Sequence, residues 1–192
     1  MLELQRFLLR RMSGSQGPGR AYDILDPDTE QPAGFTRENP GAMARRLRQF
    51  LSPRILPTRI EVREIEDESL VFIVSRSVGL FSQEIEVADA DEQLVGYLRL
   101  GAWSTNGNAR IHDRDCTLLA ELHGNWRTMN IVMLGPDGNK LGSVRTASAN
   151  DSSSATNPRS CLLVTLDECL ADQPFAKMLL LGSTLGLAFS YR

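Results

Sequence analysis

The sequence lacks the residue clusters on which several enzyme classes depend. Its three cysteines, Cys116, Cys161 and Cys169, are odd in number and show no C-x-x-C spacing, so we expect buried, reduced thiols and neither a disulfide framework nor a zinc site. The two histidines, His112 and His123, offer too few ligands for a metal centre. There is no G-x-x-x-x-G-K-[ST] loop, G-x-G-x-x-G turn or H-E-x-x-H helix. We therefore expect no enzyme activity and no cofactor.

The sequence also lacks a strong net charge and a membrane-spanning run. With 21 basic and 24 acidic residues its formal net charge is -3, which gives no overall attraction to nucleic acid. The N-terminal stretch has no continuous apolar core of the kind found in secretion signals. The uncharged run from Met178 to Tyr191 is shorter than the roughly 20 residues that a bilayer crossing needs. We expect a cytoplasmic protein of one main domain.

What the chain does have is a repeated hairpin unit. In each copy a turn rich in Asp, Pro or Gly is followed by a glycine and, three residues later, by an arginine. The three clear copies end in Gly34 and Arg37, Gly96 and Arg99, and Gly142 and Arg145. Alternating apolar and polar residues between the turns predict about ten to twelve short strands in successive antiparallel hairpins. A glycine inside a strand typically marks a bulge or a close backbone approach, which a curved sheet needs.

One apolar helix is predicted to close the chain, over residues 173–191. Asp172 is a suitable N-cap and Pro174 falls in the first turn. Because a helix that is apolar on nearly every side must be buried, we expect it to fill the lumen of a barrel. The residues expected in this core helix are Phe175, Met178, Leu179, Leu181, Gly182, Leu185, Gly186 and Phe189. The two glycines share one face, where a neighbouring backbone can approach closely.

At the other end of the chain, residues 1–19 are predicted to form an amphipathic helix followed by a linker. Apolar and basic residues alternate there at roughly helical spacing, as in helices that lie in a membrane interface. The candidate membrane-contact residues are Leu4, Arg6, Phe7, Leu8, Arg10 and Arg11. Residues 13–19 are rich in Ser, Gly and Pro and are interpreted as the linker to a barrel domain over 20–192.

Two neighbouring segments resemble a known family. Leu80 to Val87 reads LFSQEIEV and Leu94 to Leu98 reads LVGYL, which is similar to the paired strands of the phospholipid scramblase family. That family belongs to the tubby-like superfamily, together with the plant LURP-one-related proteins. The resemblance extends from about Tyr22 to the end of the chain. It implies a mainly β fold, in which a closed antiparallel barrel of twelve strands surrounds a central hydrophobic C-terminal helix, in agreement with the repeat.

The sequence departs from the animal scramblases at two functional segments. Where they carry a cysteine-rich stretch for palmitoylation, this chain reads Ser75 to Gly79 without a cysteine. Their proposed calcium segment corresponds to residues 157–166, which here contain no carboxylate. Because calcium takes six to eight oxygen ligands, several of them carboxylates, the sequence gives no support for calcium activation. True lipid scrambling is the least favoured function, because a helix that fills a barrel cannot also cross a bilayer.

The strongest candidate for a binding surface is basic. Five arginines fall within fifteen residues that hold no acidic residue and are interleaved with apolar side chains; they are Arg45, Arg46, Arg48, Arg54 and Arg59. Such segments suit an anionic membrane surface, where each basic residue contributes about 1 kcal/mol. Tubby-like domains are known for binding phosphoinositide headgroups, so the resemblance implies the same ligand class. The expected function is peripheral phospholipid binding; the alternative is a structural or protein-interaction module whose partner binds an exposed strand edge or the N-terminal helix.

Overall fold

The structure is a computed structural model that describes residues 1–12, 20–39, 57–76, 84–100, 109–147 and 161–191. It contains twelve strands: β1 (Arg6–Arg11), β2 (Arg20–Leu25), β3 (Pro32–Glu38), β4 (Thr58–Glu64), β5 (Leu70–Arg76), β6 (Glu84–Asp89), β7 (Leu94–Leu100), β8 (Ala109–Asp113), β9 (Leu118–Asn125), β10 (Asn130–Leu134), β11 (Lys140–Thr146) and β12 (Cys161–Leu166). A 3-10 turn, η2 (Glu168–Leu170), and one helix, α2 (Pro174–Tyr191), follow.

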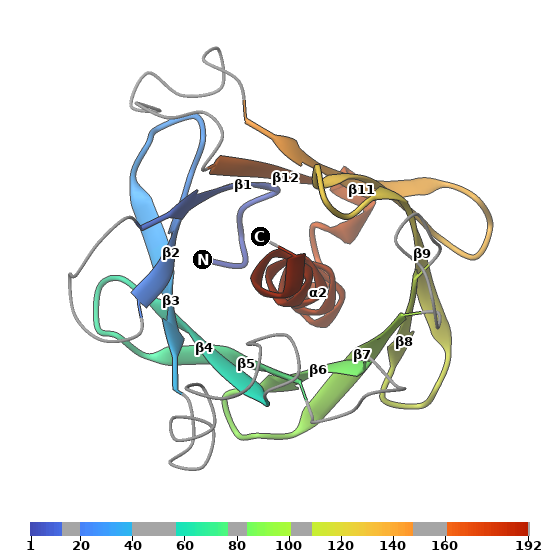
Figure 1. The fold of residues 1–192 in the computed structure, drawn as a ribbon, viewed down its shortest axis with the longest axis horizontal. Helices are drawn as coiled ribbons and strands as arrows, with labels where there is room; N and C mark the ends of the chain where they lie inside the picture. The colour runs from blue at the N-terminus through green and yellow to red at the C-terminus, as the bar shows by residue number, and fades with distance from the viewer. Residues whose placement is uncertain (13–19, 40–56, 77–83, 101–108, 148–160, 192) are drawn as a thin grey trace.

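The strands form one closed antiparallel barrel around the helix (Figure 1). Each strand pairs with its neighbour in the sequence, and β1 pairs with β12 to close the ring. The predicted fold class is therefore confirmed. Closure gives every one of the twelve strands two neighbours, so this barrel offers no free strand edge to a partner. A protein-interaction module that works by strand addition, one of the two modes predicted from the sequence, is not consistent with this topology.

The repeat glycines are required by the curvature of this barrel. A Cβ atom added at Gly34 would lie 2.6 Å from the carbonyl oxygen of Arg63, and one at Gly142 would lie 2.6 Å from that of Thr165. At Gly96 the added atom would meet the side chain of Leu179 at 2.8 Å. The pairing of β6 with β7 and of β10 with β11 shifts register just before the turn, as at a β-bulge. The expected bulge and close approach are both confirmed.

Helix α2 packs against one wall of the barrel through its two glycines. A Cβ added at Gly182 would lie 2.8 Å from Val87 Cγ2, and one at Gly186 would lie 2.6 Å from Ile85 Cγ2. Among the other predicted core residues, Met178, Leu179, Leu181 and Leu185 are buried. The helix and its glycine face are thus as predicted.

Two of the residues predicted for the buried core helix belong to the helix but are not fully buried. Phe175 is 60% exposed, which contradicts the prediction, and Phe189 is only partly buried. Both residues belong to the end turns of α2, where the helix reaches the two mouths of the barrel. Phe189 still packs edge-on against the Tyr22 ring, with ring centroids 5.2 Å apart. Because the apolar helix is longer than the barrel is tall, the residues in its first and last turns lie partly outside the core.

The predicted N-terminal amphipathic helix is wrong, because residues 6–11 form strand β1. Phe7 and Leu9 point into the main core, whereas Leu8 belongs to a second cluster with Leu25 and Leu163. Apolar residues in succession are thus buried on both faces of the strand. Pairing with both β2 and β12 satisfies the backbone and closes the ring. The predicted linker, 13–19, lies outside the described residues.

The residues before β1 enter the mouth of the barrel (Figure 1). The amino group of Met1 forms an ion pair with Glu64 Oε1 at 2.9 Å. Lys177, which is only 1% exposed, donates a hydrogen bond from Nζ to the carbonyl oxygen of Leu2 at 2.9 Å. This segment therefore fills space between α2 and the β3–β4 side of the barrel.

Two further predictions concern the state of the cysteines and the lack of a membrane-spanning helix. None of the three cysteines forms a disulfide, and Cys161 is buried, but Cys116 and Cys169 are exposed. The prediction of three buried thiols is therefore wrong for two of them, which lie at turns. Within the described ranges, no helix combines the length and the hydropathy that a bilayer crossing demands.

Candidate functional site: two oppositely charged ends of the barrel

The connections from even-numbered to odd-numbered strands, and the one from β12 to α2, all lie at one end of the barrel. They span residues 26–31, 65–69, 89–93, 113–117, 135–139 and 167–173, and we call them the acidic end. These six segments contain fifteen carboxylates and a single basic residue, Arg114. The rest of the chain therefore holds twenty basic and nine acidic residues.

Each segment of the acidic end contains an aspartate that stabilises its own turn. In every case the Oδ1 atom accepts a hydrogen bond from the backbone N–H two residues later, at 2.9–3.1 Å; the six are Asp26, Asp67, Asp89, Asp113, Asp137 and Asp167. Such a bond favours the ionised carboxylate. The N–H groups of Asp28, Ser69 and Cys169 accordingly hold the pKa values of their aspartates below the ordinary value of 3.8. The Asp-rich turn that the repeat predicts before Gly96 is thus confirmed at Asp89, and Asp113 stabilises a turn of the same kind.

The opposite end carries arginine. In eight of the twelve strands the last or next-to-last residue at this end is an arginine; we call these the arginine rim, Arg11, Arg20, Arg37, Arg59, Arg76, Arg99, Arg110 and Arg145. The repeat explains the pattern, because its turn lies at the acidic end and its arginine follows the glycine by three residues. Three strand residues span about 10 Å, which carries the arginine towards the far end. The repeat thus polarises each hairpin that contains it.

Helix α2 is aligned with this charge separation. Its N-terminus, with a partial positive charge, lies at the acidic end, and its C-terminus, with a partial negative charge, lies at the arginine rim. Arg76 Nη1 donates to Ser190 Oγ at 2.9 Å, and Ser190 Oγ donates to the Gly186 carbonyl at 2.8 Å. A cation beside the last turn stabilises the helix.

Three of the rim arginines, Arg59, Arg99 and Arg110, pair with carboxylates that are exposed or half-buried. Arg99 forms an ion pair with Glu84 at 3.1 Å and lies 5.1 Å from the centre of the Tyr97 ring, and its bonds to Glu84 raise the pKa of the guanidinium. Arg110 pairs with Glu121 at 3.0 Å. Because solvent-exposed pairs contribute about 0–1 kcal/mol, an incoming anion can compete for these arginines at small cost. In the described structure, Arg37 forms no ion pair.

Of the five predicted lipid-binding arginines, only Arg59 lies within the described residues. Its Nη2 atom pairs at 2.6 Å with Oε1 of Glu92, a carboxylate of the acidic end, so at this position the two long, exposed side chains bridge the height of the barrel wall. Arg45, Arg46, Arg48 and Arg54 lie outside the described residues. They fall in the sequence between β3 and β4, and β3 ends and β4 begins at the arginine rim.

The predicted membrane-contact residues at the N-terminus are largely unavailable to a membrane. Phe7 and Leu8 are 0% and 1% exposed, and Leu4 is partly buried against the core. Arg6 pairs with Asp28 at 2.6 Å, and Arg10 pairs with the buried Asp23 at 3.1 Å. Membrane contact through Phe7 or Leu8 would require the barrel to open, so the assignment is wrong for these two residues. Arg11 remains as a member of the arginine rim.

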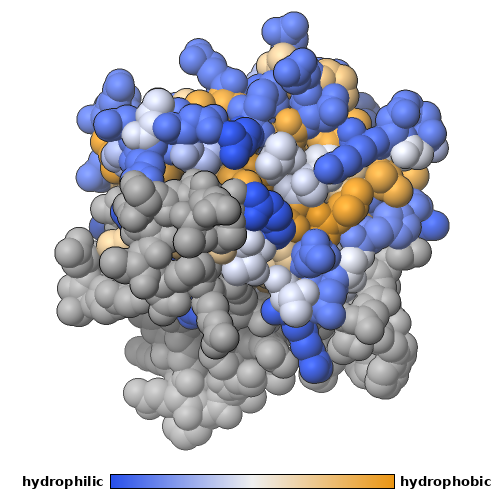
Figure 2. Space-filling view, turned by 90° about the horizontal axis from the view of Figure 1, so that it is seen from above, coloured by the Kyte–Doolittle hydropathy of each residue, from blue (hydrophilic) through white to orange (hydrophobic). Residues whose placement is uncertain are grey.

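Sequence reasoning missed the arginine rim, although its signal was present. The fixed spacing from glycine to arginine was interpreted only through the glycine. The same spacing also places the arginine of each repeat at the same height of the barrel, and this was the missed signal. On the face of the barrel that Figure 2 shows, hydrophilic side chains predominate among the coloured residues, with a smaller hydrophobic area between them.

The described residues contain no cluster of three or more His, Cys, Asp or Glu side chains that would hold a metal ion. The two histidines have separate surroundings: His112 stacks on Tyr97 with ring centroids 5.3 Å apart, and His123 Nε2 lies 3.4 Å from Glu121 Oε2. Comparison of the chain with protein-family models, curated proteins and solved structures found no match.

Proposed function

We propose that this protein is a non-catalytic, cytoplasmic, scramblase-like barrel of the tubby-like kind that binds anionic phospholipid headgroups at a membrane surface. The ligand would meet the arginine rim together with the neighbouring segment that contains Arg45, Arg46, Arg48 and Arg54. The observation that carries the proposal is the separation of charge between the two ends of the barrel. Guanidinium groups suit this ligand because they bind phosphate oxygens through paired hydrogen bonds.

The charge separation also supplies an orientation. A membrane with a negative surface potential attracts the arginine rim and repels the acidic end, although the whole chain has a net charge of -3. The attraction of each basic residue near such a surface is about 1 kcal/mol and falls within a Debye length, about 8 Å at physiological salt. Binding is therefore expected to be peripheral, reversible and sensitive to salt.

Flotation with liposomes tests this proposal directly. The protein should float with vesicles that contain phosphatidylserine or phosphoinositide and remain behind with neutral vesicles, and added salt should reduce the floated fraction. Combined replacement of Arg45, Arg46 and Arg48 by Ala removes three charges and should weaken binding by about 100-fold. Arg114→Ala removes the one arginine of the acidic end and serves as the matched control, with binding unchanged or slightly stronger.

Two results would reject the lipid proposal. One is a folded protein that floats with neither vesicle type, which would favour the alternative, a structural or protein-interaction module without a lipid role. The other is a loss of binding in the Arg114→Ala control as large as in the triple arginine variant, which would show that binding does not depend on the rim. Scrambling itself is not proposed, because Leu180, Leu181 and Leu185 of α2 are completely buried inside the barrel.

A further inference from the structure

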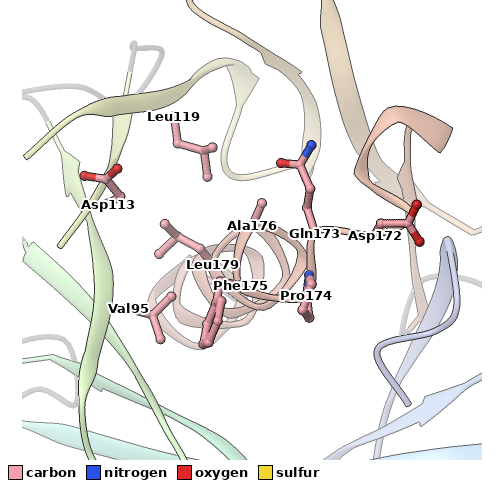
Figure 3. Close-up of a pocket in the computed structure, with 9 residues that line it drawn as sticks. All are labelled: Val95, Asp113, Leu119, Asp172, Gln173, Pro174, Phe175, Ala176 and Leu179. Atoms are coloured by element: carbon pink, nitrogen blue, oxygen red, sulfur yellow. The ribbon is translucent and has the colours of Figure 1, made fainter. Parts of the chain in front are cut away.

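A pocket opens at the acidic end, beside the first turn of α2 (Figure 3). Its volume is about 350 Å³, and its apolar lining comes from Val95, Leu119, Phe175, Ala176 and Leu179. Figure 3 shows Val95, Phe175 and Leu179 on the same side of the helix. The pocket therefore has room for one large apolar side chain and presents an aromatic ring to it.

Phe175 is the most exposed large apolar residue in the described part of the chain. Its exposed fraction is 60%, and that of Leu94, which precedes the pocket residue Val95, is 43%. Every other apolar residue of α2 from Ala176 to Ala188 is buried. Exposure of an aromatic residue beside an apolar pocket is typical of a surface that a partner covers.

Carboxylates lie in the lining of the pocket and in the chain segments that lead into it. Asp113 and Asp172 line the pocket, Asp91 lies in the turn that leads into β7, and Glu168 belongs to η2. Asp113 Oδ1 is used by its own turn, where it accepts N–H groups of Asp115 and Thr117. The side chains of Asp91, Glu168 and Asp172 make no hydrogen bond or ion pair with other described residues, so they can pair with an incoming cation.

These features select one kind of occupant. An anionic lipid or an acidic peptide would meet fifteen carboxylates at this end, so charge excludes both. A strand cannot be added, because the barrel is closed. We propose that the pocket binds a basic segment of a partner protein, which inserts one aromatic or large aliphatic side chain beside Phe175 and pairs its Lys or Arg residues with Asp91, Glu168 and Asp172. This site lies at the end opposite the arginine rim and does not depend on lipid binding.

The probe is a fluorescein-labelled peptide of sequence Lys-Arg-Lys-Phe-Lys-Arg-Lys, and the measurement is fluorescence anisotropy against the whole protein at low and physiological salt. A second peptide has Ala in place of Phe, and a third keeps Phe between Glu and Asp residues. We expect the first peptide to bind about tenfold more tightly than the second, which measures the apolar anchor, and the third not to bind.

Two variants of the protein, each with a matched control, locate the contact. Phe175→Ala should weaken the binding of the first peptide by about tenfold. Val132→Ala, which changes an exposed residue of β10, should leave this binding unchanged. Combined replacement of Asp91→Asn, Glu168→Gln and Asp172→Asn should weaken binding and reduce its salt dependence, whereas Glu86→Gln on the barrel wall should have no effect. Phe175, Asp91, Glu168 and Asp172 lie at turns or at the start of a helix, and Val132 and Glu86 lie in strands. Because all six side chains are exposed, the variants should fold, as circular dichroism will verify.

Three outcomes would overturn the inference. Equal binding of the Phe and Ala peptides would reduce the site to general charge attraction. Equal binding to wild type and to the Phe175→Ala variant would place the contact elsewhere. Loss of liposome flotation in the Phe175→Ala variant, with peptide binding unchanged, would identify Phe175 as a membrane anchor; retention of flotation together with loss of peptide binding supports two separate sites.

Discussion

Replacement of Gly182 by Ala tests how closely α2 packs against the barrel wall. The added Cβ would lie 2.8 and 3.1 Å from the two Cγ atoms of Val87 and 3.3 Å from Phe72 Cε2, all closer than a comfortable van der Waals contact. Alanine favours a helix over glycine by about 1 kcal/mol. Overpacking a rigid core costs about 1–3 kcal/mol, and Val87 is β-branched and fully buried, so it has little freedom to move.

We therefore expect Gly182→Ala to lower the free energy of unfolding by about 1–2 kcal/mol, and the melting temperature by about 2–8 °C. Val87→Ala alone should cost about 2–3 kcal/mol, because it leaves a cavity. In the double variant the new methyl group enters the space that Val87 vacates, so the two costs should not add. A favourable coupling of about 1–2 kcal/mol is expected.

Guanidinium denaturation followed by circular dichroism measures all four proteins of this cycle. If Gly182→Ala were as stable as the wild type and additive with Val87→Ala, the helix would not be seated on β6, and the close packing would be refuted.

Three other measurements test further features. Ser183→Ala should raise the free energy of unfolding by about 1 kcal/mol in the same denaturation assay, because Ser183 is fully buried and its Oγ lacks a hydrogen-bond partner within the described structure. Asp26, Asp67 and Asp167 have pKa values below 3.8, so the stability that their turns contribute is complete above that pH and is lost as the pH falls through the lowered values; NMR titration of the carboxyl carbons should give midpoints below 3.8, and ordinary midpoints would contradict the turn geometry. Hydrogen bonding to the Asp167 carboxylate raises the pKa of the Cys169 thiol, so Asp167→Asn should speed the alkylation of Cys169 by iodoacetamide near pH 8, measured by peptide mass spectrometry, while Cys116 serves as the internal control.

Local sequence signals predicted the parts of this fold that are decided locally. Asp-rich turns, repeat glycines and the apolar run after Pro174 each specify a structure within about a dozen residues, and all were predicted correctly. The glycine face of α2 was also predictable, because Gly182 and Gly186 are four residues apart.

The errors arose where the outcome depends on distant partners. Phe7, Leu8 and Leu9 are compatible with either a helix or a strand, and the choice is made by β12, whose Leu163 pairs with Leu8 across 155 positions of sequence. Phe175 was assigned to the core because the helix is apolar throughout, but the height of the barrel decides where the core ends. The arginine rim needed the strands to be aligned, which brings residues such as Arg37, Arg99 and Arg145 to one end.

The order of the elements along the chain has a consequence for biosynthesis. Translation delivers the barrel wall before the helix that fills it, and the strand that closes the ring, β12, comes after all the others. A nascent chain that has reached β11 carries inward-facing apolar residues on eleven strands. It still lacks β12, which closes the ring, and α2, which fills the barrel. Productive folding must therefore wait until β12 and α2 have left the ribosomal exit tunnel, and until then the chain depends on factors that shield its apolar strands. Slowing translation within the early hairpins should bring little benefit, whereas occupancy by a chaperone should persist until β12 and α2 have been synthesised.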